Sequence, residues 1–72
     1  MHKSRRSSAC VLGRNLRRAR LDRKMTQEEV AERSGVHATE VSRIEGGKRD
    51  PQVSTVERLA EAVGLTASDL LR

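Results

Sequence analysis

The sequence predicts an all-α domain, a compact bundle of about five short helices. Apolar residues recur at spacings of three and four in several short windows, which is the period of an amphipathic helix. Glycine, proline and capping residues separate these windows, and no window shows the alternation typical of a strand. The chain has 72 residues and no aromatic ones, so its core is expected to be small and aliphatic.

The N-terminal part divides into an arm and a first helix. Residues 1–9 are polar and basic without periodicity, and we expect a disordered basic arm in front of a domain over residues 10–72. The first helix is expected at about residues 11–23. Its apolar side consists of Leu12, Leu16 and Ala19.

Residues 26–45 predict two short helices, at about 27–34 and 38–45, joined by a tight turn. Thr26 is expected to cap the first helix by accepting from the backbone N–H of Glu29, whose carboxylate reaches back to the N–H of Thr26. Gly35 stands where the chain must turn with a positive φ. The apolar positions of the unit are Val30, Ala31, Val36, Val41 and Ile44. Such a unit is a helix-turn-helix, which places its second helix in the DNA major groove.

Two further helices are expected beyond a loop at residues 46–51, which contains two glycines and a proline. A fourth helix is expected to start at Ser54, with Glu57 as its capping-box partner. Its apolar positions are Val56, Leu59, Ala60 and Val63. Thr66 with Asp69 is expected to cap a last short helix that carries Leu70 and Leu71.

The charge is strongly uneven along the chain. Residues 1–24 carry nine lysines and arginines against one acidic residue, a net charge of +8, whereas residues 25–72 carry six basic and nine acidic residues, a net charge of −3. A basic arm and first helix are typical of a surface that faces a polyanion. Alternatives are a merely solvated basic helix, a helix on an anionic membrane surface, or an organelle transit peptide at residues 1–23. Loss of a transit peptide would remove the apolar side of the first helix.

The composition gives little support to other classes of function. A single cysteine allows no internal disulfide, and Cys10 with His2 and His37 shows no metal-ligand spacing. No apolar run approaches the length of a membrane span, and a reducing, intracellular compartment is expected. No catalytic residues, metal, cofactor or small-molecule ligand are predicted, since no nucleophile, base and acid are grouped by spacing.

The chain resembles the lambda-repressor-like (Cro/repressor, XRE-type) helix-turn-helix family from Leu12 to Leu71. The matching residues are Leu12-Gly13, Leu16-Arg17, Arg20, Met25 to Ala31, Gly35-Val36, Val41 to Gly47, Pro51, Leu59-Ala60 and Gly64-Leu65. The resemblance implies a cytoplasmic, bacterial or phage-like transcriptional regulator that binds specific double-stranded DNA. A homodimer on an inverted repeat is expected, because one recognition helix reads only a few base pairs.

Candidate base-reading residues lie on the exposed side of the helix at 38–45. Arg43 is the main one, since a guanidinium can hold guanine O6 and N7 together, with a phosphate contact or a pair with Glu40 as the alternative. Ala38 and Thr39 suit a thymine methyl group, unless they only fill the helix start. Ser42 can reach either a base or a phosphate.

Candidate phosphate-binding residues come from three segments of the chain. They are Gln27, His37, Lys48, Arg49, Arg14 and Arg17. The family places a glutamine like Gln27 at a helix N-terminus beside a phosphate. The resemblance also implies that Arg20 and Glu45 form a buried ion pair between the first and third helices, with a structural role.

Two residues depart from the family pattern. His37 stands where the family commonly has a Ser or Thr cap, and Lys24 stands where a glycine often ends the first helix, which predicts backbone strain there. Three alternatives to a simple regulator remain open. One is an antitoxin or restriction-modification controller with the same DNA chemistry, the second is a protein-binding adaptor, and the third is a membrane-surface peptide. Leu65, Leu70 and Leu71 are expected either to form a dimer patch with the fourth and fifth helices or to close the core.

Overall fold

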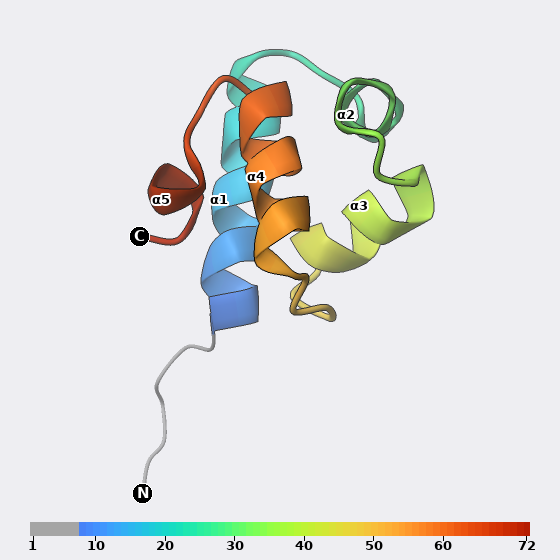
Figure 1. The fold of residues 1–72 in the computed structure, drawn as a ribbon. Coiled ribbons are helices and arrows are strands. Elements are labelled where there is room, and N and C mark those ends of the chain that lie inside the picture. The colour runs from blue at the N-terminus through green and yellow to red at the C-terminus, as the bar shows by residue number, and fades with distance from the viewer. Residues whose placement is uncertain (1–7) are drawn as a thin grey trace, which may run out of the picture.

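The described part of the chain, residues 8–72 of a computed structural model, is a bundle of helices (Figure 1). The helices are α1 (Ser8–Asp22), α2 (Gln27–Ser34), α3 (Ala38–Glu45), α4 (Val53–Ala62) and α5 (Ala67–Leu70). No strand occurs within these residues. The predicted all-α architecture is therefore confirmed for them, and residues 1–7 of the expected arm lie outside the described residues.

The helix α1 starts earlier than the sequence indicated. It begins at Ser8 rather than at about residue 11, so the last two residues of the expected arm are helical. It ends at Asp22, and Lys24 follows with a φ of 56°, in the left-handed region. The strain predicted at Lys24 is confirmed, because a side chain at this φ crowds the backbone.

Two predicted capping boxes are present. The Oγ1 atom of Thr26 accepts from the N–H of Glu29 at 3.0 Å, and the Thr26 N–H donates to the Glu29 carboxylate at 2.8 Å. Thr66 and Asp69 repeat this pattern at 3.1 and 3.0 Å at the start of α5. The bonds donated by Thr66 lower the pKa of the Asp69 carboxyl below its usual value. Gly35 ends α2 with a φ of 75°, as its position in the turn required.

The expected start of α4 was wrong. The helix begins at Val53, its N-cap is Gln52, and no side chain caps it. The N–H of Val56 donates to the carbonyl of Gln52 at 3.0 Å, so the first helical turn closes before Ser54 can act as a cap. Ser54 therefore lies within the first turn, and no Ser54–Glu57 box forms.

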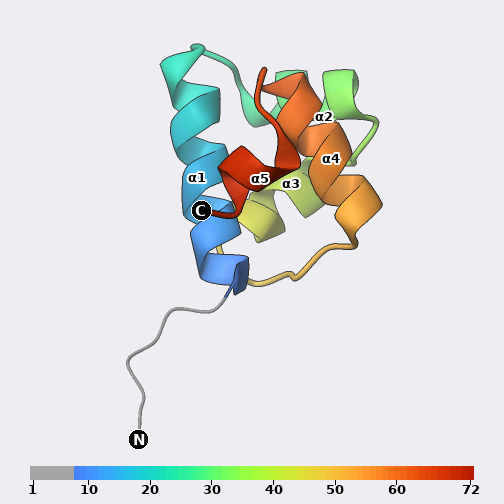
Figure 2. The ribbon, with the colours of Figure 1, turned by 60° about the vertical axis from the view of Figure 1, so that its left-hand side comes forward.

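The core lies where all five helices meet. It contains Leu12, Leu16, Ala19, Met25, Val30, Val36, Val41, Ile44, Val56, Leu59, Ala60, Ala62, Val63 and Leu70. Helix α3 packs on α1 and α2, and α4 packs on α2 and α5. Figure 2 shows α5 between α1 and α4, and it contacts both helices. Leu70 closes the core, Leu65 is partly buried, and Leu71 stays 50 % exposed. Within residues 8–72, no helix combines the length and the hydrophobicity of a membrane span.

Candidate nucleic-acid interface

Helix α3 has a buried side and an open side. Val41 and Ile44 are fully buried against the rest of the core. Thr39, Ser42 and Arg43 are exposed, and Ala38 is partly exposed. The four residues predicted to read bases therefore share the side of α3 that its neighbours leave uncovered.

The start of α3 is capped by His37. Its Nδ1 atom accepts from the backbone N–H of Thr39 at 3.2 Å, in the place of the serine or threonine oxygen that the family commonly uses. The bond requires that Nδ1 carries no proton. His37 is exposed at the N-terminal end of the helix.

The end of α3 is held by a buried ion pair with α1. Nε of Arg20 lies 2.7 Å from Oε2 of Glu45, and Nη2 of Arg20 donates to Oε1 at 3.0 Å. The two side chains are only 11 % and 4 % exposed. The hydrogen bond with Glu45 raises the pKa of the Arg20 guanidinium above its ordinary value, although burial acts in the opposite direction. Arg20 also donates to the carbonyl of Met25 at 2.8 Å, which ties the α1–α2 turn to the same pair.

Gln27 joins this network from the first residue of α2. Its Nε2 atom donates to Oε1 of Glu45 at 3.1 Å, so the amide has a fixed orientation at the helix N-terminus. Gln27 lines a depression of about 270 Å³ with Arg17, Arg20, Ser42, Glu45 and Gly46. The structure thus brings three of the predicted DNA-binding residues, Arg17, Gln27 and Ser42, to one concave surface beside the exposed side of α3.

The other predicted phosphate-binding residues lie outside this depression. Arg49, in the loop after α3, has its Nε atom 3.4 Å from Oε1 of Glu40. The two side chains are 49 % and 33 % exposed. Lys48 is exposed in the same loop, and Arg14 is exposed on α1. Glu40 thus pairs with Arg49 and not with Arg43, the partner considered from the sequence.

Two residues that fix how other elements pack on α1 were not given a role from the sequence. A Cβ atom at Gly13 would overlap the carbonyl oxygen of Ile44 and come within 2.9 Å of that of Glu45, so only glycine lets α1 approach α3 this closely. A glycine inside a helix is itself a signal of close packing, since it costs about 1 kcal/mol relative to alanine. Asn15 donates from Nδ2 to the carbonyl of Leu70 at 2.8 Å and thereby anchors α5 on α1.

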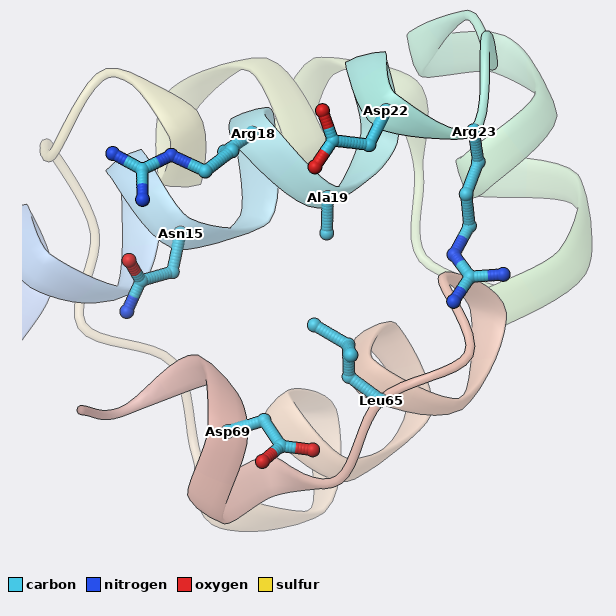
Figure 3. Close-up of a pocket in the computed structure, with 7 residues that line it drawn as sticks. All are labelled: Asn15, Arg18, Ala19, Asp22, Arg23, Leu65 and Asp69. Atoms are coloured by element: carbon cyan, nitrogen blue, oxygen red, sulfur yellow. The ribbon is translucent and has the colours of Figure 1, made fainter.

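A second hollow, of about 490 Å³, separates α1 from the segment that leads into α5. In Figure 3, Ala19 and Leu65 point toward one another across it, with Asp22 and Asp69 on opposite sides. Asp69 is committed to capping α5, and the other polar lining residues are Asn15, Arg18 and Arg23. The hollow therefore contains neither a nucleophile nor a histidine. Among residues 8–72, no group of three or more potential metal ligands occurs.

Comparison with known proteins agrees with this geometry. Residues 11–72 match the family model described as a helix-turn-helix domain. The HTH-type transcriptional regulator y4dJ of Sinorhizobium fredii, itself uncharacterized, is 39 % identical over 61 residues, which are 85 % of this chain and 79 % of that protein. The HTH-type transcriptional repressor RghR of Bacillus subtilis is 43 % identical over 60 residues, which are 82 % of this chain but only 44 % of RghR.

Among solved structures, the restriction-modification controller protein C.AhdI from Aeromonas hydrophila is similar in fold. It superposes with a TM-score of 0.82 and is 27 % identical, and the match covers 86 % of this chain and 94 % of that one. The predicted helix-turn-helix resemblance and the all-α fold are both confirmed by these matches.

Proposed function

The chain belongs to the helix-turn-helix family of DNA-binding transcriptional regulators, and we propose that it binds specific double-stranded DNA as a homodimer on an inverted repeat. The observation that carries this proposal is the fixed orientation of α3. Val41 and Ile44 are buried, the Arg20–Glu45 pair holds the helix end, and the opposite side remains open. A helix held in this way can enter the major groove as a rigid reader.

Sequence is read by the exposed side of α3. Arg43 binds guanine through O6 and N7, and Ala38 and Thr39 contact thymine methyl groups near the start of the helix. Ser42 stands beside the depression that Arg17 and Gln27 also line, so it reaches the border between base edges and backbone. Arg43 is the residue on which specificity depends most.

The sugar-phosphate backbone is held on both sides of α3. On one side, Gln27 and Arg17 bind a phosphate at the N-terminus of α2, where the backbone N–H groups and the helix dipole also favour an anion. On the other side, Lys48 and Arg49 contact the backbone from the loop. Arg14 and the free nitrogen of His37 add contacts at the edge of the interface.

Dimerisation supplies the specificity that one helix lacks. A single α3 reads only a few base pairs, and two copies related by a two-fold axis double the recognised length. The exposed Leu71 and the partly buried Leu65 flank α5 and offer an apolar contact there. The regulator acts in the cytoplasm, where the DNA of a bacterial cell lies.

Selection of bound duplexes from a random pool tests the proposal directly. We expect an enriched inverted repeat, and binding to it should weaken with salt with a slope of log K against log[salt] of roughly −4 to −8 per dimer. A flat salt response and no enriched sequence would contradict DNA binding and support a protein-binding adaptor instead. Enrichment of one unrepeated half-site would contradict only the dimer.

A restriction-modification controller is the second candidate function. It is favoured by the structural similarity to C.AhdI, a controller protein. The selected operator separates the two functions, because a controller would find it in front of genes for a methyltransferase and an endonuclease. An operator in front of other genes would favour a regulator of another kind.

A further inference from the structure

Helix α1 holds the end of α3 at two points on one of its sides. The backbone carbonyls of Ile44 and Glu45 approach Gly13 so closely that no side chain fits there. Arg20 forms its buried pair with Glu45 at 2.7 Å. Gly13 and Arg20 are about two helical turns apart, so they lie on the same side of α1. The end of α3 is therefore fixed relative to α1 at two separate points.

Asn15 lies on nearly the opposite side of α1 and holds α5. Successive residues of an α-helix are rotated by about 100°, so Asn15 is rotated by about 200° from Gly13. Its Nδ2 atom donates to the backbone carbonyl of Leu70 at 2.8 Å. Leu70 is fully buried, so its side chain fixes how deeply α5 sits on the core. The hydrogen bond is directional, so it also fixes the angle of α5 about that leucine.

Beyond Asn15, α1 and the segment that leads into α5 are held apart. The hollow of about 490 Å³ begins beside Asn15 and separates them (Figure 3). Ala19 and Leu65 face each other across it. No ion pair among residues 8–72 bridges the hollow. The bond from Asn15 is therefore the directional link that sets the angle between α1 and α5.

We propose that the bond from Asn15 to Leu70 sets the spacing between the two DNA half-sites that a homodimer of this chain recognises. The exposed Leu71 and the partly buried Leu65 flank α5 in the proposed dimer contact, so the angle of α5 determines the angle between the two copies. Helix α1 carries this angle to α3 through the two contacts on its other side. Asn15 is thus a positioning residue that acts through α5, and its role rests on the proposed homodimer.

A small rotation at the dimer contact is enough to change the spacing. The two reading helices of a helix-turn-helix dimer lie about 34 Å apart, and adjacent base pairs of DNA are about 3.4 Å apart. A rotation of about 6° moves a helix at that distance by about 3.5 Å, which is one base-pair step. Discrimination between spacings that differ by one base pair therefore needs an angle held within a few degrees. Burial of a leucine alone does not hold an angle, because the hydrophobic effect is non-directional.

Duplexes with altered half-site spacing test this role of Asn15. The inverted repeat selected by the wild-type protein is compared with versions whose spacing is one base pair shorter or longer. Asn15→Ala removes the donor, and Asn15→Asp keeps the volume but places a carboxylate, which accepts only, against the Leu70 carbonyl. Each variant should lower the preference for the original spacing by about threefold to tenfold, the range that one hydrogen bond contributes. The affinity for a duplex with one half-site should stay unchanged.

Asp22→Asn is the matched control for the two variants. Asp22 lines the same hollow from the side of α1, and among residues 8–72 it forms no ion pair. This variant should keep the wild-type preference for spacing. Thermal denaturation shows whether each variant is folded, and Asn15→Asp, which opens no cavity, carries the test if Asn15→Ala unfolds.

The outcomes separate this inference from the proposed function. An unchanged spacing preference in both Asn15 variants would overturn the inference and leave the DNA-binding homodimer intact. Equal losses of affinity for one half-site and for the full repeat would also overturn it, because they would show only a general loss of structure. A wild-type protein that binds half-sites without any spacing preference would overturn the proposed homodimer together with the inference.

Discussion

Helix α3 takes part in two Arg–Glu ion pairs, one near each end. The two pairs differ in the distance between their charged atoms and in the exposure of their side chains. Arg20 and Glu45 meet at 2.7 Å with 11 % and 4 % exposure, whereas Arg49 and Glu40 meet at 3.4 Å with 49 % and 33 % exposure. The buried pair is also bonded by Gln27 and, through Arg20, to Met25. Water competes with each partner of the exposed pair for hydrogen bonds, so this pair contributes little to the free energy of unfolding. The same two residue types therefore hold the fold at one end of α3 and lie partly exposed near the other, where we propose that Arg49 contacts DNA.

The largest effect is expected from breaking the buried pair. Glu45→Ala leaves the guanidinium of Arg20 buried without a counter-charge, which costs about 3–5 kcal/mol of unfolding free energy. In a domain of this size the thermal midpoint falls by roughly 4–8 °C for each kcal/mol. Thermal and urea denaturation measure the loss of unfolding free energy. Glu40→Ala is the control, and it should lose less than about 1 kcal/mol. Equal losses in the two variants would show that burial does not distinguish the pairs.

Arg43→Ala is expected to have the next largest effect, on binding and not on stability. It should cost about 1–3 kcal/mol on the selected site and relax the preference at one base pair in each half-site. Lys48→Ala should instead weaken all sequences alike. Competition binding with single-base variants of the site measures both. A uniform loss in Arg43→Ala would reassign Arg43 to a phosphate contact.

Changes to the exposed Arg49–Glu40 pair are expected to have a smaller effect on DNA affinity. The sign of that effect shows whether Glu40 competes with phosphate for Arg49. If phosphate competes with Glu40 for Arg49, then Arg49→Ala weakens binding to every sequence and makes the salt slope shallower by about 1 per copy. Glu40→Gln should do the reverse and tighten binding, since it removes the competitor. Titrations at several salt concentrations measure the slopes. Weaker binding by Glu40→Gln would show that Glu40 directs Arg49 toward the DNA.

The smallest effect is expected at the cap of α3. Nδ1 of His37 accepts the backbone N–H of Thr39 at 3.2 Å, so removal of this acceptor should lower the free energy of unfolding by about 1 kcal/mol. His37→Ala removes the cap, whereas His37→Ser keeps an oxygen that can cap the helix. Thermal denaturation of the two variants measures the difference. Equal stability of His37→Ala and wild type would show that the bond contributes nothing to the helix.

Local signals gave most of the elements correctly, and the errors have local causes. The boxes at Thr26 and Thr66 were predictable because each partner lies three residues away. The start of α4 was not, because Ser54 and Glu57 match the same pattern while the backbone already turns at Gln52. A capping pattern indicates a position at which a helix can start. The backbone conformation of the preceding residues determines whether a helix has already started before that position.

The sequence by itself determined the helical periodicity, the turn at Gly35, the uneven charge and the side of α3 that stays exposed. The periodicity, the turn and the exposed side of α3 depend on residues within one or two helical turns of each other, and the uneven charge depends only on which residues each half of the chain contains. Tertiary structure alone decided why Gly13 must be a glycine, where Asn15 anchors α5, and that Glu40 holds Arg49. These contacts join residues from different elements, and a side chain's partner across a bundle depends on the angle and distance at which its helices pack.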